Sequence, residues 1–187
     1  MKPTVITGIH AFSLACLLAI PATASAQTIV EVGGGWNYPG TGPSGETYSH
    51  GWTARVSVGP QLASNFLLRI DGIMSQFVDS VQFYPPCPFP GCTHAYYNAQ
   101  TVNILGVVAN GILNVDHRGI FYLIGGAGAY DVNARNHDLH MGLSAGAGIA
   151  LPVGPRLRAV AEARWNGLVG GTTGPSWFAP VTFGLRY

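Results

Sequence analysis

Apolar and polar side chains alternate with a period of two along much of this chain, and no other feature constrains its fold as strongly. Within residues 179–187, Phe183 and Leu185 lie on one face of an extended segment, whereas Thr182 and Arg186 lie on the other. Successive side chains of a β-strand point to opposite faces. The alternation therefore predicts strands with one apolar and one polar face.

Eight segments fit such strands, and short and long connections alternate between them. The segments cover residues 28–38, 50–59, 66–77, 97–113, 119–131, 139–151, 157–166 and 179–187. Short connections are expected at residues 59–60, 114–118 and 153–156, and longer ones at 39–49, 78–96, 132–138 and 169–177. A membrane strand needs about 9–11 residues. We therefore predict an all-β fold, an eight-stranded antiparallel up-and-down transmembrane β-barrel.

The composition favours a membrane barrel over a soluble β-sandwich, whose strands would also alternate. Charged residues make up 9% of the chain, against about 25% in an average soluble domain. The exposed face of a sandwich would carry many Lys and Glu side chains, whereas the polar face of these segments consists mainly of Gly, Ser, Thr and Asn. Nine basic and eight acidic residues nearly cancel, which argues against a nucleic-acid partner.

Residues 1–26 have the pattern of a secretory signal peptide that is cleaved after Ala26. Lys2 gives a positive start, residues 9–20 are mostly apolar, and small residues precede the cleavage point. We expect the barrel to occupy residues 27–187. Because Lys2 is the only lysine, the mature chain would hold eight basic side chains against eight acidic ones.

Aromatic side chains gather near the ends of the predicted strands. In a membrane barrel they would form girdles at the two interfaces, and closure of the barrel would pair every backbone polar group in lipid. The aromatics in question are Trp36, Tyr38, Trp52, Phe66, Phe77, Tyr96, Tyr97, Tyr130, Trp165, Phe178 and Tyr187.

The chain resembles the small eight-stranded outer-membrane barrels of the OmpA membrane-domain and OmpX type. The resemblance rests on the export signal, the amphipathic strands, the alternating connections and an ending in which Phe183, Leu185 and Tyr187 share one face. It implies that this ending is read by the barrel-assembly machinery, although the family more often ends in Phe than in Tyr. It also implies a monomer among the lipids of the bacterial outer membrane, with four extracellular loops open to a surface partner that the sequence does not identify.

Eight ionisable residues fall on the predicted inner face, three of them acids and five of them arginines. An eight-stranded barrel is just wide enough for side chains to fill it, and a buried charge without a partner is costly. We therefore expect a paired network that plugs the lumen, with a narrow gated ion path through the same residues as the alternative. The predicted network comprises Glu31, Arg55, Arg69, Asp71, Arg158, Glu162, Arg164 and Arg186.

Two cysteines, Cys87 and Cys92, enclose Pro-Phe-Pro-Gly in the second long connection. Export to an oxidising compartment favours a disulfide between them over two free thiols. A metal site is disfavoured because His94 is the one nearby third ligand, and zinc is held by three or four protein ligands. We expect no metal and no cofactor.

A lipid A deacylase is the enzymatic alternative, because some barrels of this type modify lipid A. The chain offers His137, Asp138, His140 and Ser144, with Glu162 on the next strand, for a nucleophile, a base and an orienting carboxylate. The His-x-Ser spacing of those enzymes is absent, and His140 and Ser144 lie about 13 Å apart along a strand. We therefore predict no catalytic residue and expect a structural barrel, serving envelope integrity or surface interaction, with a small low-conductance pore as the main alternative.

Overall fold

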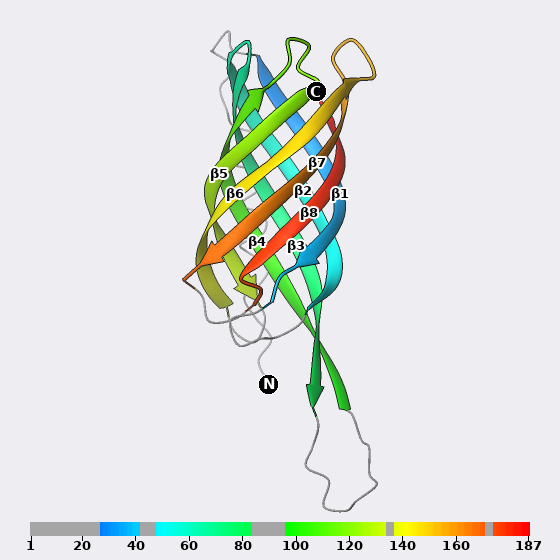
Figure 1. Cartoon of the computed structure of the whole chain (residues 1–187), viewed down its shortest axis with the longest axis vertical. Helices are drawn as coiled ribbons and strands as arrows, with labels where there is room; N and C mark the ends of the chain where they lie inside the picture. Colours follow the sequence, from blue (N-terminus) through cyan, green and yellow to red (C-terminus); the bar gives the residue numbers. More distant parts are fainter. Residues whose placement is uncertain (1–26, 42–47, 84–95, 134–136, 171–173) are drawn as a thin grey trace, which may run out of the picture.

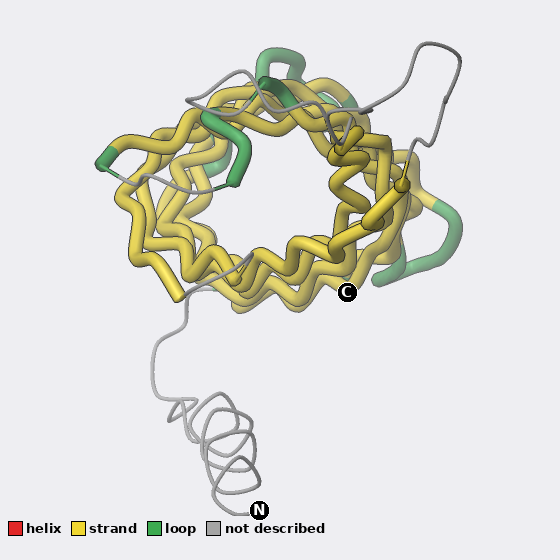
Figure 2. Tube along the Cα trace, turned by 90° about the horizontal axis from the view of Figure 1, so that it is seen from below, coloured by secondary structure: helices red, strands yellow, loops and turns green. Residues whose placement is uncertain are grey.

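The chain forms one closed β-barrel of eight antiparallel strands, which confirms the predicted fold class (Figure 1). The computed structural model describes residues 27–41, 48–83, 96–133, 137–170 and 174–187. The strands are β1 (Thr28–Pro39), β2 (Tyr48–Ala63), β3 (Phe66–Phe83), β4 (Tyr96–Asn114), β5 (Phe121–Asn133), β6 (His137–Pro152), β7 (Arg158–Val169) and β8 (Trp177–Arg186). Each strand pairs with its neighbours in the sequence, and β1 pairs with β8, so the ring seen end-on in Figure 2 has no free edge. Within the described residues, no helix is long and apolar enough to cross a membrane.

The barrel wall has an apolar outside and buried side chains inside, as the alternation predicts. In β8, Phe183 and Leu185 are 54% and 48% exposed on the outer surface, whereas Thr182 and Arg186 are buried inside. Trp165 of β7 is likewise exposed on the outer surface. Alternate residues of each strand therefore lie on the outer and the inner face of the closed wall.

The connections between strands lie at the two ends of the barrel. Residues 64–65, 115–120 and 153–157 form three short turns at the end where the chain terminates at Tyr187, the upper end in Figure 1. We call it the short-turn end. The other four connections lie at the opposite end, which we call the long-loop end. The predicted alternation of short and long connections is wrong at one place, because the β5–β6 connection, expected to be long at residues 132–138, spans only residues 134–136.

The short connection predicted at residues 59–60 is wrong, because β2 continues to Ala63 and turns at residues 64–65. Gly59 lies within β2, where the close approach of β3 requires a residue without a side chain. A Cβ atom added at Gly59 would lie 1.8 Å from the backbone oxygen of Leu68 on β3, so only glycine permits this approach of the two strands. Pairing of β2 with β3 is irregular beyond this point, between Gln61 and Ala63, and also near the start of β2, between Ser49 and Trp52.

The hairpin of β3 and β4 is longer than predicted and projects past the barrel at the long-loop end (Figure 1). The register runs without interruption from Phe66 opposite Leu113 to Phe83 opposite Tyr96. Part of the predicted long connection at residues 78–96 is therefore strand. The predicted signal peptide and the predicted pairing of Cys87 with Cys92 lie outside the described residues.

Candidate functional site

The interior of the barrel is filled by three layers of side chains stacked along its axis. A charged layer occupies the middle, with one apolar layer on each side of it. The apolar layer toward the long-loop end, which we call the loop-side layer, contains Ile73, Phe77, Val102, Ile104, Val108, Tyr130, Val132 and Phe178. The apolar layer toward the short-turn end, which we call the turn-side layer, contains Ile29, Leu67, Ile112, Tyr122, Ile124, Ala150 and Val160.

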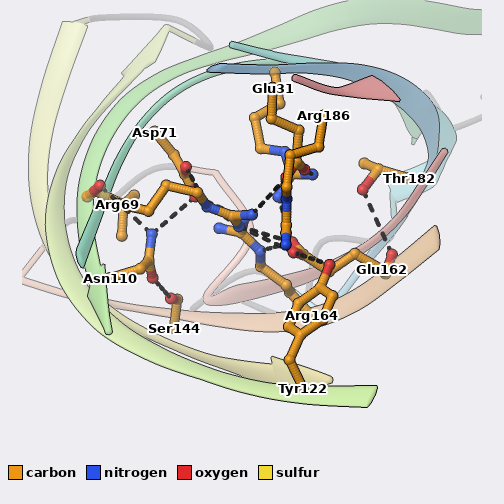
Figure 3. A network of polar contacts seen from close by, with 12 residues as sticks. Glu31, Arg69, Asp71, Asn110, Tyr122, Ser144, Glu162, Arg164, Thr182 and Arg186 are labelled. Atoms are coloured by element: carbon orange, nitrogen blue, oxygen red, sulfur yellow. Dashed lines mark hydrogen bonds and ion pairs between the residues drawn. The ribbon is translucent and has the colours of Figure 1, made fainter. Parts of the chain in front are cut away.

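Glu162 of β7 lies at the centre of the charged layer (Figure 3). Its Oε1 accepts hydrogen bonds from Arg55 and Arg164. Its Oε2 accepts from Nη2 of Arg69 at 2.9 Å and from the hydroxyl of Tyr122 at 2.8 Å. These donors come from β2, β3, β5 and β7, so this one carboxylate connects strands from several parts of the ring.

Glu31 of β1 is the second carboxylate of the layer and is fully buried. Arg55 donates to its Oε1, and its Oε2 accepts from Nη1 of Arg69 at 3.1 Å and from Nε of Arg186 at 2.8 Å. Glu31 and Arg186 stand directly opposite each other in the β1–β8 pairing. This ion pair therefore joins the first and last strands where the barrel closes.

Asp71 of β3 is the third carboxylate, and it connects the ion pairs to neutral polar groups. Its Oδ1 lies 2.8 Å from Nε of Arg69, and its Oδ2 lies 2.6 Å from Nη2 of Arg164. Asn110 donates from Nδ2 to Asp71 Oδ2 at 2.8 Å, and Ser144 donates to Asn110 Oδ1 at 2.7 Å. The network thereby extends across the lumen from β3 through β4 to β6 (Figure 3).

Four guanidinium groups face three carboxylates in this layer, which leaves one excess positive charge. Each carboxylate contacts at least two arginines. The planar fork of arginine can bridge two acids at once, which a lysine ammonium does less well. Since a buried ion that loses its partner is strongly destabilising, the layer is stable only as a connected set.

The structure brings seven of the eight predicted network residues together and sets Arg158 apart. Arg158 is the first residue of β7 and is half-buried, and its Nη1 donates to the backbone oxygen of Gly119 at 2.8 Å. Val160, in the turn-side layer, separates it from Glu162 along the inner face of β7. Arg158 therefore belongs to the short-turn end, although its position in the alternating pattern of β7 places it on the same inward face as Glu162.

The loop-side layer corrects the prediction that all strand-end aromatics point outward. Phe77, Tyr130 and Phe178 are buried inside the barrel at 1%, 0% and 0% exposure. Their rings pack edge to face, with centroids of Phe77 and Phe178 at 6.1 Å and of Tyr130 and Phe178 at 5.7 Å. Tyr130 also donates to Oδ1 of Asn166 at 3.1 Å. Bulky aromatic side chains can fill the lumen of a narrow barrel, just as paired charged side chains can.

The residues weighed for a deacylase do not form a nucleophile and base. Ser144 uses its hydroxyl to donate to Asn110 within the charged layer. His140 lies four residues away on β6, with Nε2 3.8 Å from Oδ2 of Asp138, and His137 is exposed beside Asp131. Among the described residues, no three His, Cys, Asp or Glu side chains gather as a metal site.

The predicted assembly ending lies on the outer surface of the barrel. Phe183, Leu185 and Tyr187 are 54%, 48% and 61% exposed along one outer row. The amide of Tyr187 donates to the oxygen of Val30 at 2.8 Å, and the amide of Val30 donates back at 3.0 Å. The ending is therefore hydrogen-bonded to β1 while its apolar side chains face outward.

Comparison with known proteins supports the fold alone. No protein-family model matches the chain, and no curated protein matches its sequence. The crystal structure of Neisserial surface protein A is similar, with a TM-score of 0.62 and 15% sequence identity over 87% of this chain and 98% of that one.

Two further solved structures match less well. They are Ail, the attachment invasion locus protein of Yersinia pestis, and a major outer membrane protein from Thermus thermophilus, each with a TM-score of 0.49 and 11% identity. The match with Ail covers 88% of this chain and 100% of that one, and the Thermus match covers 86% and 99%. Both scores are too low to add to the likeness with the Neisserial protein.

Proposed function

We propose that the chain is a structural barrel of the bacterial outer membrane, similar in kind to OmpA and OmpX barrels, whose lumen is sealed. It would be exported, inserted as a monomer with the long-loop end outside, and serve envelope integrity or the display of the four loops at that end to a surface partner. One observation carries the proposal: an apolar outer wall surrounds an interior that is filled and charge-paired.

The outer wall supports the membrane part of the proposal. Its exposed apolar side chains would be unfavourable in water, at roughly 25 cal/mol for each Å² of apolar surface, and a soluble monomer rarely shows a large continuous apolar patch. These side chains include Val30, Val32, Trp36, Trp52, Val56, Leu68, Ile70, Met74, Leu105, Val107, Leu123, Met141, Leu143, Trp165, Phe183 and Leu185.

The layered interior supports the sealed lumen. An ion crossing the barrel would have to pass two apolar layers and displace the arginines that pair with Glu31, Asp71 and Glu162. Moving a charge past apolar side chains costs far more than moving it through water. A pore would therefore need a rearrangement of all three layers, and a structural barrel needs none.

Quenching of tryptophan fluorescence by brominated lipids tests insertion directly. Trp36, Trp52 and Trp165 face outward with 60%, 41% and 48% exposure, so bromine on lipid chains should quench most of the emission of the folded protein in vesicles. The water-soluble quencher iodide, applied to the same vesicles, should have little effect. Strong quenching by iodide with none by the brominated lipids would refute membrane insertion.

Two features of the proposed mature chain stay predictions. The first is cleavage after Ala26, which amino-terminal sequencing of the protein from outer membranes would show.

The second is a disulfide between Cys87 and Cys92, for which alkylation before and after reduction, followed by intact-mass measurement, should add label only after reduction. Labelling of both thiols without reductant would exclude the disulfide.

A further inference from the structure

A cavity of about 340 Å³ opens at the short-turn end of the barrel. It lies among the three short turns and the two ends of the described chain, Gln27 and Tyr187. Ile29 and Leu67 of the turn-side layer line it on the inner side. We call this cavity the cup and the side chains of Ile29 and Leu67 its apolar floor; Arg186 of the charged layer also lines it.

The charge of this cup is strongly one-sided. Four arginines line it, namely Arg118, Arg156, Arg158 and Arg186, together with His117. Among the described residues lining the cavity there is no Asp or Glu. Guanidinium groups gathered around one cavity repel one another unless acidic groups or a bound anion offset their charge.

Three of the four guanidinium groups make no ion pair with a described residue. Arg158 donates to the oxygen of Gly119, and Arg156 donates to the hydroxyl of Tyr187 at 3.3 Å. Arg118 has an exposed side chain. Arg186 alone is neutralised, by Glu31 at 2.8 Å.

The carboxylate of Asp116, on the same turn as Arg118, accepts hydrogen bonds from backbone amides. Its Oδ1 accepts from the amide of Phe121 at 2.8 Å, and its Oδ2 accepts from the amide of Arg118 at 3.2 Å. Asp116 therefore holds the β4–β5 turn in place instead of pairing with the Arg118 guanidinium. The same turn carries Gly119, whose φ of 62° is readily adopted only by glycine, and whose oxygen fixes Arg158.

We propose that this cup is a binding site for an oxyanion, a phosphate or carboxylate group carried by a small molecule. Arginine forks recognise both groups through paired charge-assisted hydrogen bonds. Arg158 is positioned by Gly119, Arg118 lies on the same turn, and Gln61 and Asn114 add amide groups to the lining. The volume falls at the lower end of the range of about 300–1,000 Å³ that is typical of small-molecule sites, and the apolar floor suits a ligand with an organic part.

Calorimetric titration with pyrophosphate tests the site on the folded full-length barrel in maltoside micelles, whose detergent carries no phosphate. We expect saturable binding to one site, beyond the heat from sodium chloride of equal ionic strength. The double variant R118Q/R158Q should bind about tenfold more weakly or worse, because a hydrogen bond to a charged group contributes roughly a factor of ten or more. R158K, which keeps the charge but loses the fork, should bind with intermediate affinity.

The control variant is H137Q, which alters an exposed ring at the opposite end of the barrel and should leave binding unchanged. If the double variant fails to fold, R118Q alone decides the matter, since Arg118 is an exposed residue of a turn and its loss should still weaken binding. Binding of equal strength in the wild type and these variants, or no saturable heat with any probe, would overturn the proposal.

Titration with phosphatidylglycerol in mixed micelles separates a lipid headgroup from a free anion. Binding of pyrophosphate in water identifies a soluble ligand. Binding of the lipid alone, with the same dependence on Arg118 and Arg158, identifies the headgroup as the source of the phosphate. Either result supports the oxyanion site, whereas failure of the lipid-quenching experiment would contradict the membrane proposal without affecting this one.

Discussion

At the scale of single residues, Glu162 decides whether the charged layer holds together, because three arginines and Tyr122 converge on it. E162Q keeps the shape but removes the charge, which leaves those guanidinium groups underpaired. We expect the free energy of unfolding to fall by about 3–5 kcal/mol, the range for breaking a buried ion pair. Urea unfolding of the barrel in lipid vesicles measures it.

The matched control for that residue is D131N. Asp131 also pairs with a basic ring, that of His137 at 3.2 Å, but both side chains are exposed. An exposed ion pair contributes little to the stability of the folded state, so D131N should change the free energy of unfolding by less than about 0.5 kcal/mol. Equal effects of E162Q and D131N would mean that the layer does not depend on its central carboxylate.

At the scale of elements, the seam between β1 and β8 depends on close backbone approach. A Cβ atom added at Gly35 would lie 1.9 Å from the backbone oxygen of Val181, whereas one at Gly125 would meet nothing nearer than 3.9 Å. G35A should therefore force the seam apart and cost about 1–3 kcal/mol, as overpacking does, while G125A should be nearly neutral. Hydrogen exchange of β1 and β8 amides should rise in G35A alone; unchanged protection there would contradict the role of the glycine.

The last strand also carries the predicted assembly signal. Replacing Phe183 and Tyr187 together by Asp should sharply reduce the amount of protease-protected barrel in membranes, because both side chains lie in the outward row and charges on a lipid-facing wall are destabilising. S49D, an exposed change in β2 near the long-loop end, is the control and should assemble normally. Wild-type levels of the double variant would argue against the signal.

A strand with one apolar and one polar face could be both located and oriented from the sequence. A strand with two apolar faces could be located, but the face that points into the lumen could not be identified. In β8, Phe183 faces out and Arg186 faces in, so the pattern shows both the strand and its orientation. In β4, the buried Ile104 and Val108 alternate with the exposed Leu105 and Val107, and no contrast of polarity tells the lumen from the outside. The contribution of β4 to the loop-side layer could therefore not be predicted.

Contacts inside the charged layer depend on information that no single strand contains. Asn110 reaches Asp71 because the register sets Asn110 opposite Arg69, one inward step from Asp71. Tyr122 joins the layer although it belongs to an apolar cluster, because its hydroxyl extends to Glu162. Periodicity could therefore predict which acids and arginines point inward, but not the neutral groups that complete their hydrogen bonds.

At the scale of the whole molecule, closing the sheet into a narrow ring also determines what its interior can hold. A ring of eight strands leaves an interior that side chains can fill, and this chain fills it with an ionic layer between two apolar ones. The carboxylates of Glu31, Asp71 and Glu162 are buried, and their ion pairs link strands that are distant in the ring, such as β3 and β7. We therefore expect a sealed lumen.

Planar-bilayer recording of the purified wild-type barrel tests that claim most directly. The account predicts no steady conductance at moderate voltage, and at most brief openings that become more frequent in E162Q, where the arginines around Glu162 lose a partner. Large and stable channels in the wild type, with an ion selectivity that changes when Arg55 or Arg164 is replaced by Gln, would contradict it.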